Sequence, residues 1–231
     1  MTRSVKVLLL VVAVFAPGYG LYSYLVPSVT VRYRLTLEAD VAGQSAVGSG
    51  VIEVTNEDNQ RLFGSLGGLG GEINGQAVIL DLGGRGSLFA LLHGPGELRE
   101  DKTYPMRVLF YAFPTLINPQ EYLAGLRKLK AQQPTADLPF DLLPMLVRFR
   151  DLNDPTSVEQ VQPNDLAAAF GPGVQLKKAT IAITDDPVTT GIEHKLPWLV
   201  GLQKGFAVKT PRPGGSVATV LSSLDFERRG F

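Results

Sequence analysis

The sequence predicts a mainly β domain, antiparallel-rich or α+β in class, preceded by one N-terminal transmembrane helix. Three features lead to this prediction: an uncharged, mostly apolar run at residues 7–26, alternation of apolar and polar side chains at residues 29–41, and short apolar stretches set among 25 glycines and 16 prolines. We therefore divide the chain into an anchor at residues 1–27 and a single domain at residues 28–231.

The N-terminal run has the length of a membrane span. As a helix it would match the roughly 30 Å hydrocarbon core of a bilayer. Arg3 and Lys6 precede it, which favours a cytoplasmic N-terminus. Tyr22 and Tyr24 lie towards its other end, where aromatic rings favour the membrane interface.

Two other interpretations of this run remain open. A signal peptide could be cleaved after Ala16, although Pro17 would then follow the cut directly and the apolar character continues beyond it. The run could also be a buried helix of a soluble protein. We expect a single-pass protein of the bacterial inner membrane, bound to the lipid bilayer through residues 7–26, with its domain in the periplasm.

The composition narrows the classes of partner and chemistry. Lys and Arg number 22, and so do Asp and Glu, whereas proteins that bind nucleic acid carry a basic excess. We therefore expect no nucleic-acid partner. The chain has no cysteine, which excludes a thiol nucleophile, thiolate metal ligands and disulfides.

Alternation predicts a β-hairpin at the start of the domain. Residues 29–41 form one strand, a turn follows at Ala42-Gly43-Gln44, and residues 47–54 return as the antiparallel partner. Gly48 and Gly50 indicate a bulge or a close backbone approach. Asn74-Gly75 predicts a second hairpin turn, because both residues tolerate positive φ.

Other segments are assigned by their apolar pattern. The remaining predicted strands are residues 76–82, 87–92, 106–113, 146–152, 179–183 and 217–226, with 87–92 buried on both faces. A helix is predicted from Asn118, with an apolar stripe at Tyr122, Leu126 and Leu129, and a short helix is predicted at residues 163–170.

Motifs for common chemistries do not occur in the sequence. His93 and His194, the two histidines, lack the spacing of a zinc site, and no G-x-S-x-G sequence is present. The glycine cluster at residues 64–75 lacks the Gly-Lys-Ser/Thr of a phosphate-binding loop. We predict no cofactor.

A Ser-His-Asp arrangement stays open, because triads assemble in space, but two acidic turns stand out as candidates for a chemical site. Asp151, Asn153 and Asp154 lie in the first, and Asp185 and Asp186 lie in the second. Their oxygens would suit Ca²⁺ or acid–base catalysis if the fold brought the turns together. We favour a structural interpretation, because Asp before Pro is common in turns, where the carboxylate accepts backbone N–H bonds.

These turns also carry a resemblance. Residues 147–158, 165–171, 184–192 and 196–199, which include Asp151-Leu152-Asn153-Asp154-Pro155 and Leu196-Pro197-Trp198-Leu199, resemble a group of bacterial hypothetical proteins with a similar N-terminal anchor. The resemblance implies a bacterial source and covers most of the chain, but it implies no activity, cofactor or partner.

The sequence therefore predicts a membrane-anchored periplasmic accessory or binding module, in contact with other membrane or periplasmic proteins as a subunit of a larger assembly. Two alternatives remain: a hydrolase that acts on envelope material through the carboxylates of the acidic turns, and a small-molecule carrier with a pocket between sheet and helix.

Overall fold

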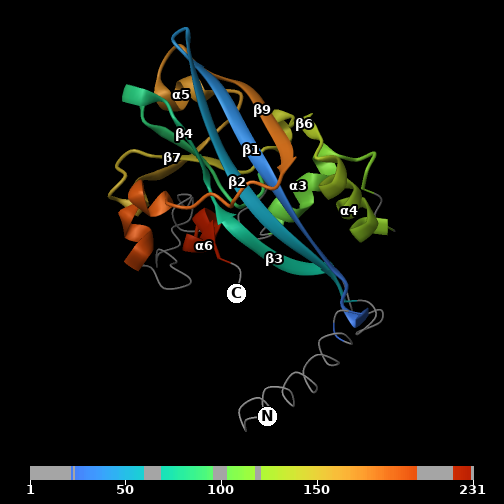
Figure 1. The fold of residues 1–231 in the computed structure, drawn as a ribbon. Helices are drawn as coiled ribbons and strands as arrows, with labels where there is room; N and C mark the ends of the chain where they lie inside the picture. The colour runs from blue at the N-terminus through green and yellow to red at the C-terminus, as the bar shows by residue number, and fades with distance from the viewer. Residues whose placement is uncertain are drawn as a thin grey trace, which may run out of the picture.

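The structure is a computed structural model that describes residues 22, 24–59, 69–95, 103–117, 121–201 and 221–229. Within these residues the protein is mainly β, with two antiparallel sheets (Figure 1). Sheet 1 has the spatial order β10 (Glu227–Arg228), β3 (Leu69–Gln76), β2 (Gln44–Asp58), β1 (Ser28–Val41), β9 (Val174–Thr184) and β6 (Thr135–Asp137). Sheet 2 has the order β4 (Val78–Asp81), β5 (Ser87–Ala90), β7 (Leu146–Phe149) and β8 (Val158–Val161).

The predicted first hairpin is confirmed. β1 and β2 pair from Ser28↔Glu57 to Val41↔Gln44 without a shift in register. Ala42 and Gly43 form the loop with φ values of 52° and 88°, which is the positive-φ pair that a tight two-residue hairpin turn requires. The alternating apolar side chains of β1 are buried, as the pattern predicted.

The predicted turn at Asn74-Gly75 is wrong. Asn74 pairs with Glu53 of β2, and Gly75 pairs with Arg228 of β10, so both residues lie inside β3. After β3 the chain passes through Ala77 directly into β4 and changes from sheet 1 to sheet 2. Strand neighbours on both sides of β3 hold these residues extended and override their turn preference.

The two sheets approach closely where β4 passes β2. A Cβ atom at Gly48 would lie 2.2 Å from the carbonyl oxygen of Ile79 and 2.7 Å from the Cα of Leu80. Only glycine allows this backbone contact. The predicted close approach at Gly48 is therefore confirmed, and it fixes the distance between the sheets at this point.

The helices are α3 (Tyr104–Ala112), α4 (Tyr122–Gln132), α5 (Leu166–Phe170) and α6 (Ser223–Phe226). The strand predicted at residues 106–113 is wrong, because these residues belong mainly to α3. The predicted strand at 217–226 is also wrong where the structure describes it, since its end forms α6. The predicted stripe Tyr122, Leu126 and Leu129 is buried in α4, and Gly171 follows α5 as expected. Asn118 lies outside the described residues.

Short 3₁₀ helices connect several of these elements. They are η2 (Gly83–Arg85), η4 (Phe140–Leu142), η5 (Pro155–Ser157), η6 (Ile192–His194) and η7 (Pro197–Gly201). η2 joins β4 to β5 in a glycine-rich turn, and η4 follows Pro139 between β6 and β7.

Two apolar cores lie on either side of sheet 2. The larger core joins the inner face of sheet 1 to one face of sheet 2 and to α3, α4 and α5. The smaller core joins the other face of sheet 2 to η6, η7 and α6. Ser87 to Ala90 are all buried, which confirms that β5 is enclosed on both faces.

The predicted membrane span lies almost wholly outside the described residues. No helix among the residues that the structure describes is long and apolar enough to cross a membrane. At the entry to the domain, Val26 is 3% exposed, and the backbone N–H of Asp58 donates to the Pro27 carbonyl at 3.0 Å.

Candidate functional site

The first acidic turn connects β7 to β8 and is held by its own side chains. Asp154 caps η5, and its Oδ1 accepts from the backbone N–H of Thr156 at 2.8 Å and from the Thr156 hydroxyl at 2.7 Å. Bonds from the hydroxyl and then the backbone N–H of Thr156 lower the pKa of the Asp154 carboxyl. Asp151 accepts from the backbone N–H of Asn153 at 2.9 Å. These oxygens form the turn.

Trp198 ties this turn to the smaller core. Its indole N–H donates to the carbonyl of Leu152 at 2.9 Å, while its ring lies against Phe149 and Phe226 at centroid distances of 5.6 and 5.8 Å. The only tryptophan of the chain is thus half-buried against the smaller core, with its polar atom satisfied. It positions the turn and does not form an exposed stacking platform.

The second acidic turn is bonded to residues that lie far from it in sequence. Asp186 Oδ2 lies 2.6 Å from the Arg34 guanidinium and accepts from the Thr184 hydroxyl at 2.8 Å. The Arg34 bond, followed by the Thr184 bond, lowers the pKa of the Asp186 carboxyl. Among the described residues the donors to the Asp186 carboxylate are side chains, and the expected backbone N–H bond is not found there. Asp185 accepts from the Gln133 side chain at 2.5 Å.

Residues 185–190, which we name the strap, run from the end of β9 across the outer face of sheet 1. Arg32 of β1 donates to the Asp185 carbonyl at 3.4 Å. At the far side, Thr189 bonds to Val51 of β2 twice, through its hydroxyl at 2.8 Å and its backbone N–H at 3.1 Å. The acidic turn therefore fastens a crossing segment to β1 and β2.

The structure does not unite the two turns. Among the described residues, the hydrogen-bond partners of the first turn come from residues 151–157 and 198, whereas those of the second come from β1, β9 and the end of α4. Among the described residues there is no group of three or more His, Asp or Glu side chains suited to a metal ion. A shared carboxylate site for the two turns is not formed.

The outer face of sheet 1 carries an organised set of polar side chains. Its alternate side chains form rows across the strands: Thr30 bonds to Thr55 at 2.9 Å, Arg32 to Glu53 at 2.7 Å, and Asn74 to Glu53 at 3.5 Å. Nearer the hairpin tip, Lys178 pairs with Asp137 at 3.0 Å. These charges are paired within the face and half-exposed, so the face is polar but close to neutral.

Sequence reasoning placed Arg32 and Arg34 on this face but did not find their partners. Alternation along β1 locates both side chains on the wet side. Asp186 lies 152 residues from Arg34 in sequence, so only the fold brings them together.

A buried ionic cluster near the C-terminus was also missed. Asp225 is 2% exposed, and its Oδ2 accepts from the backbone N–H and hydroxyl of Ser222 at 2.6 and 2.9 Å. Arg228 donates to the Leu92 carbonyl at 3.0 Å. Burial lowers the pKa of Arg228, while nearby Asp225 raises it. This cluster fastens the C-terminal segment to the end of β5.

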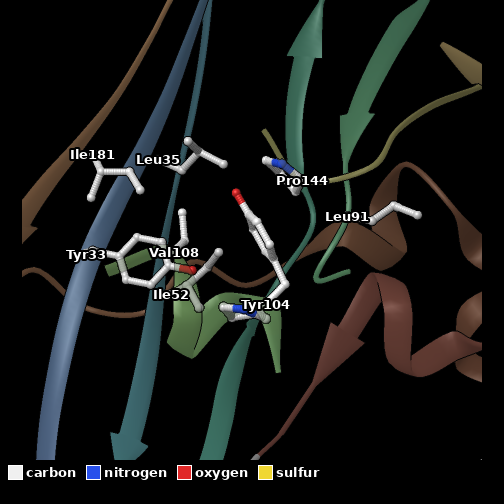
Figure 2. Close-up of a pocket in the computed structure, with 9 residues that line it drawn as sticks. Tyr33, Leu35, Ile52, Leu91, Tyr104, Val108, Pro144 and Ile181 are labelled. Carbon is white, nitrogen blue, oxygen red and sulfur yellow. The ribbon is translucent and has the colours of Figure 1, made fainter. Parts of the chain in front are cut away.

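A small cavity lies between the inner face of sheet 1 and α3, and Figure 2 shows the side chains around it. Its volume is about 10 Å³, which suits at most one water molecule. Tyr33, Leu35 and Tyr104 are among its lining residues, and the Tyr104 hydroxyl donates to the Leu142 carbonyl at 2.6 Å. Burial raises the pKa of Tyr33 far above its usual value. This cavity is far too small for a carried ligand.

Comparison with known proteins found no family model, curated protein or solved structure that matches the chain.

Proposed function

We propose that this chain is a membrane-anchored binding module, held in the bacterial inner membrane by residues 7–26 and presenting the outer face of sheet 1 to another protein of the envelope. The observation that carries the proposal is this outer face. The larger core, α3, α4, α5 and sheet 2 all lie on the inner side of sheet 1, while rows of paired polar side chains occupy the outer side.

Such a face suits recognition of a folded partner. Its side chains are held by cross-strand bonds, so little conformational entropy would be lost when a partner binds. Val47, on the same face near the hairpin tip, is 61% exposed and supplies an apolar contact among polar neighbours, which is the usual composition of a non-obligate interface.

The way the chain enters the domain supports the anchor. Val26 is buried, and its backbone N–H donates to the Tyr22 carbonyl at 2.7 Å. The Pro27 carbonyl accepts a hydrogen bond from the backbone N–H of Asp58. No spacer separates the end of the apolar run from β1, so a span at residues 7–26 would hold the sheet close to the bilayer.

The two alternatives find less support. A hydrolase that uses the acidic turns needs a carboxyl group whose pKa is raised towards the working pH, whereas the pKa values of Asp154 and Asp186 are lowered. A carrier needs an apolar pocket of several hundred Å³, and the cavity beside α3 holds about 10 Å³.

Site-specific photo-crosslinking in native membranes tests the proposal. A photoreactive residue replaces Thr36, which pairs with Ser49 and Thr180 in the middle of the outer face, and a control replaces Gln160, which is exposed on β8. We expect a discrete adduct from position 36 that survives denaturing electrophoresis and is absent from position 160. Absence of an adduct at position 36, or the same adducts at both positions, would contradict the proposal.

A further inference from the structure

We infer that the basic surface of α4, formed by Arg127, Lys128 and Lys130, contacts anionic phospholipid headgroups beside the proposed anchor. The inference rests on the proposed membrane anchor and adds a second point of contact with the same bilayer. It concerns lipid recognition, whereas the outer face of sheet 1 concerns a protein partner.

First, α4 lies at the end of the domain where the chain enters β1. Lys130 Nζ donates to the carbonyl of Thr30 at 3.2 Å, and the Tyr122 hydroxyl bonds to Asn56 at 2.5 Å. Asn56 pairs with Val29 in the β1–β2 hairpin. Both ends of α4 are therefore fixed to the first residues of β1 and the last residues of β2, and Figure 1 shows α4 beside the lower part of β1.

The second step is the distance to the bilayer. Thr30 follows Val26 by four residues, which is roughly 13 Å along an extended strand. The headgroup layer adds roughly 6 Å beyond the hydrocarbon core, and electrostatic attraction extends about 8 Å at physiological ionic strength. The Lys130 ammonium, which lies at the level of Thr30, is thus roughly 7 Å beyond the headgroup layer and within the range of this attraction.

The third step is charge and exposure. Arg127, Lys128 and Lys130 are all exposed on the C-terminal half of α4. Of the carboxylates nearby, Glu57 and Asp58 are half-buried, while Glu72 of β3 and Glu121 at the start of α4 are exposed. Long cationic side chains extend to headgroups while their stems stay on the protein. Tyr22 and Tyr24 are 52% and 66% exposed just before the domain, and such rings favour the same interface. Basic and aromatic groups therefore gather where the chain would leave the bilayer.

The absence of cysteine allows a direct test on the full chain. A fluorophore is attached to Gln132→Cys at the end of α4, or to Gln160→Cys on β8 as a control; both glutamines are exposed. The protein is placed in nanodiscs of phosphatidylcholine alone or with phosphatidylglycerol, each containing a headgroup-linked quencher. We expect the anionic lipid to increase quenching at position 132 at least twofold and to leave position 160 unchanged.

Two variants separate lipid contact from a general effect of charge. Arg127→Gln, Lys128→Gln and Lys130→Gln together should abolish the increase. Arg150→Gln, Lys177→Gln and Lys178→Gln remove the same charge elsewhere and should preserve it. An increase that is equal at both positions, or that survives in the α4 variant, overturns the inference.

If residues 7–26 do not anchor the chain, the nanodisc experiment has a different outcome. If the chain does not stay in the nanodiscs, the proposed anchor is wrong, and flotation of the free chain with phosphatidylglycerol vesicles then decides the lipid contact. Binding that the α4 variant abolishes supports the contact without the anchor, and no binding overturns both.

Discussion

Sheet 2 is enclosed on both faces, whereas sheet 1 is enclosed on its inner face and carries paired polar side chains on its outer face. The sequences differ accordingly: Ser87 to Ala90 of β5 are buried without interruption, while β1 alternates. Stability should therefore depend mainly on sheet 2 and on the contact between the sheets, while the part of the outer face that the strap leaves uncovered remains available for binding.

The largest effect is expected in β5. Phe89 is fully buried in the smaller core, with its ring 5.5 Å from that of Phe149, so Phe89→Ala should lower the free energy of unfolding by about 3–5 kcal/mol. Thr36→Ala on the outer face of sheet 1 should change it by less than about 0.5 kcal/mol. Chemical denaturation of both variants measures the difference. Similar losses of unfolding free energy in the two variants would contradict the larger contribution of sheet 2 to stability.

The contact between the sheets predicts the next effect. Gly48→Ala places a Cβ atom 2.2 Å from the Ile79 carbonyl oxygen, which is backbone and cannot rotate away, so we expect a loss of about 1–3 kcal/mol. Gly84→Ala is the control, since nothing lies within 4 Å of its added Cβ. Equal unfolding midpoints for the two variants would contradict the close approach of β4 to β2.

The strap predicts a smaller, pH-dependent effect. Because Arg34 lowers the pKa of Asp186 in the folded protein, the ion pair stabilises the fold above the unfolded pKa of about 3.9, and this contribution is lost as the pH falls through the lower folded value. Asp186→Asn should lower the Tm by roughly 2 °C at pH 7, and the difference should shrink as the pH falls below the unfolded pKa. A constant difference over this range would exclude the ion pair as its cause.

The first acidic turn predicts the smallest effect. Asn at position 154 keeps a side-chain oxygen that accepts the Thr156 N–H, so Asp154→Asn should leave the Tm nearly unchanged, while Asp154→Ala should lower it. Melting in calcium and in chelator provides the decisive comparison. A calcium-dependent rise in the parent protein that disappears in Asp154→Asn would refute the structural role.

The comparison also explains which elements could be predicted from the sequence. The β1–β2 hairpin was predictable because its alternation and its turn are local. The helix α3 was not, although Tyr104 and Val108, which are four residues apart and both buried, carried a helical spacing that the short apolar run obscured. Asn74-Gly75 failed because β2 and β10 hold it extended from both sides, and β10 lies about 150 residues further along the chain.

The sequence identified the acidic residues of the candidate site but not the distant residues that bind them. The local bonds of Asp154 follow from its position before Pro155, and the sequence anticipated them. The bonds of Asp186 to Arg34 and of Asp185 to Gln133 join segments that are distant in sequence. Sequence pattern gives the face of a strand but not the segment that crosses it, so the strap was found only in the structure.

The proposed function depends on residues 7–26 remaining attached to the domain and lying in the bilayer, and the lipid contact of α4 is argued from the same anchor. The most direct test is intact-mass spectrometry of the mature protein after separation of native membranes from the soluble fraction. We expect the protein in the inner-membrane fraction, with its apolar N-terminal run retained. A soluble protein whose N-terminus lies near Pro17 or Ser28 would contradict it.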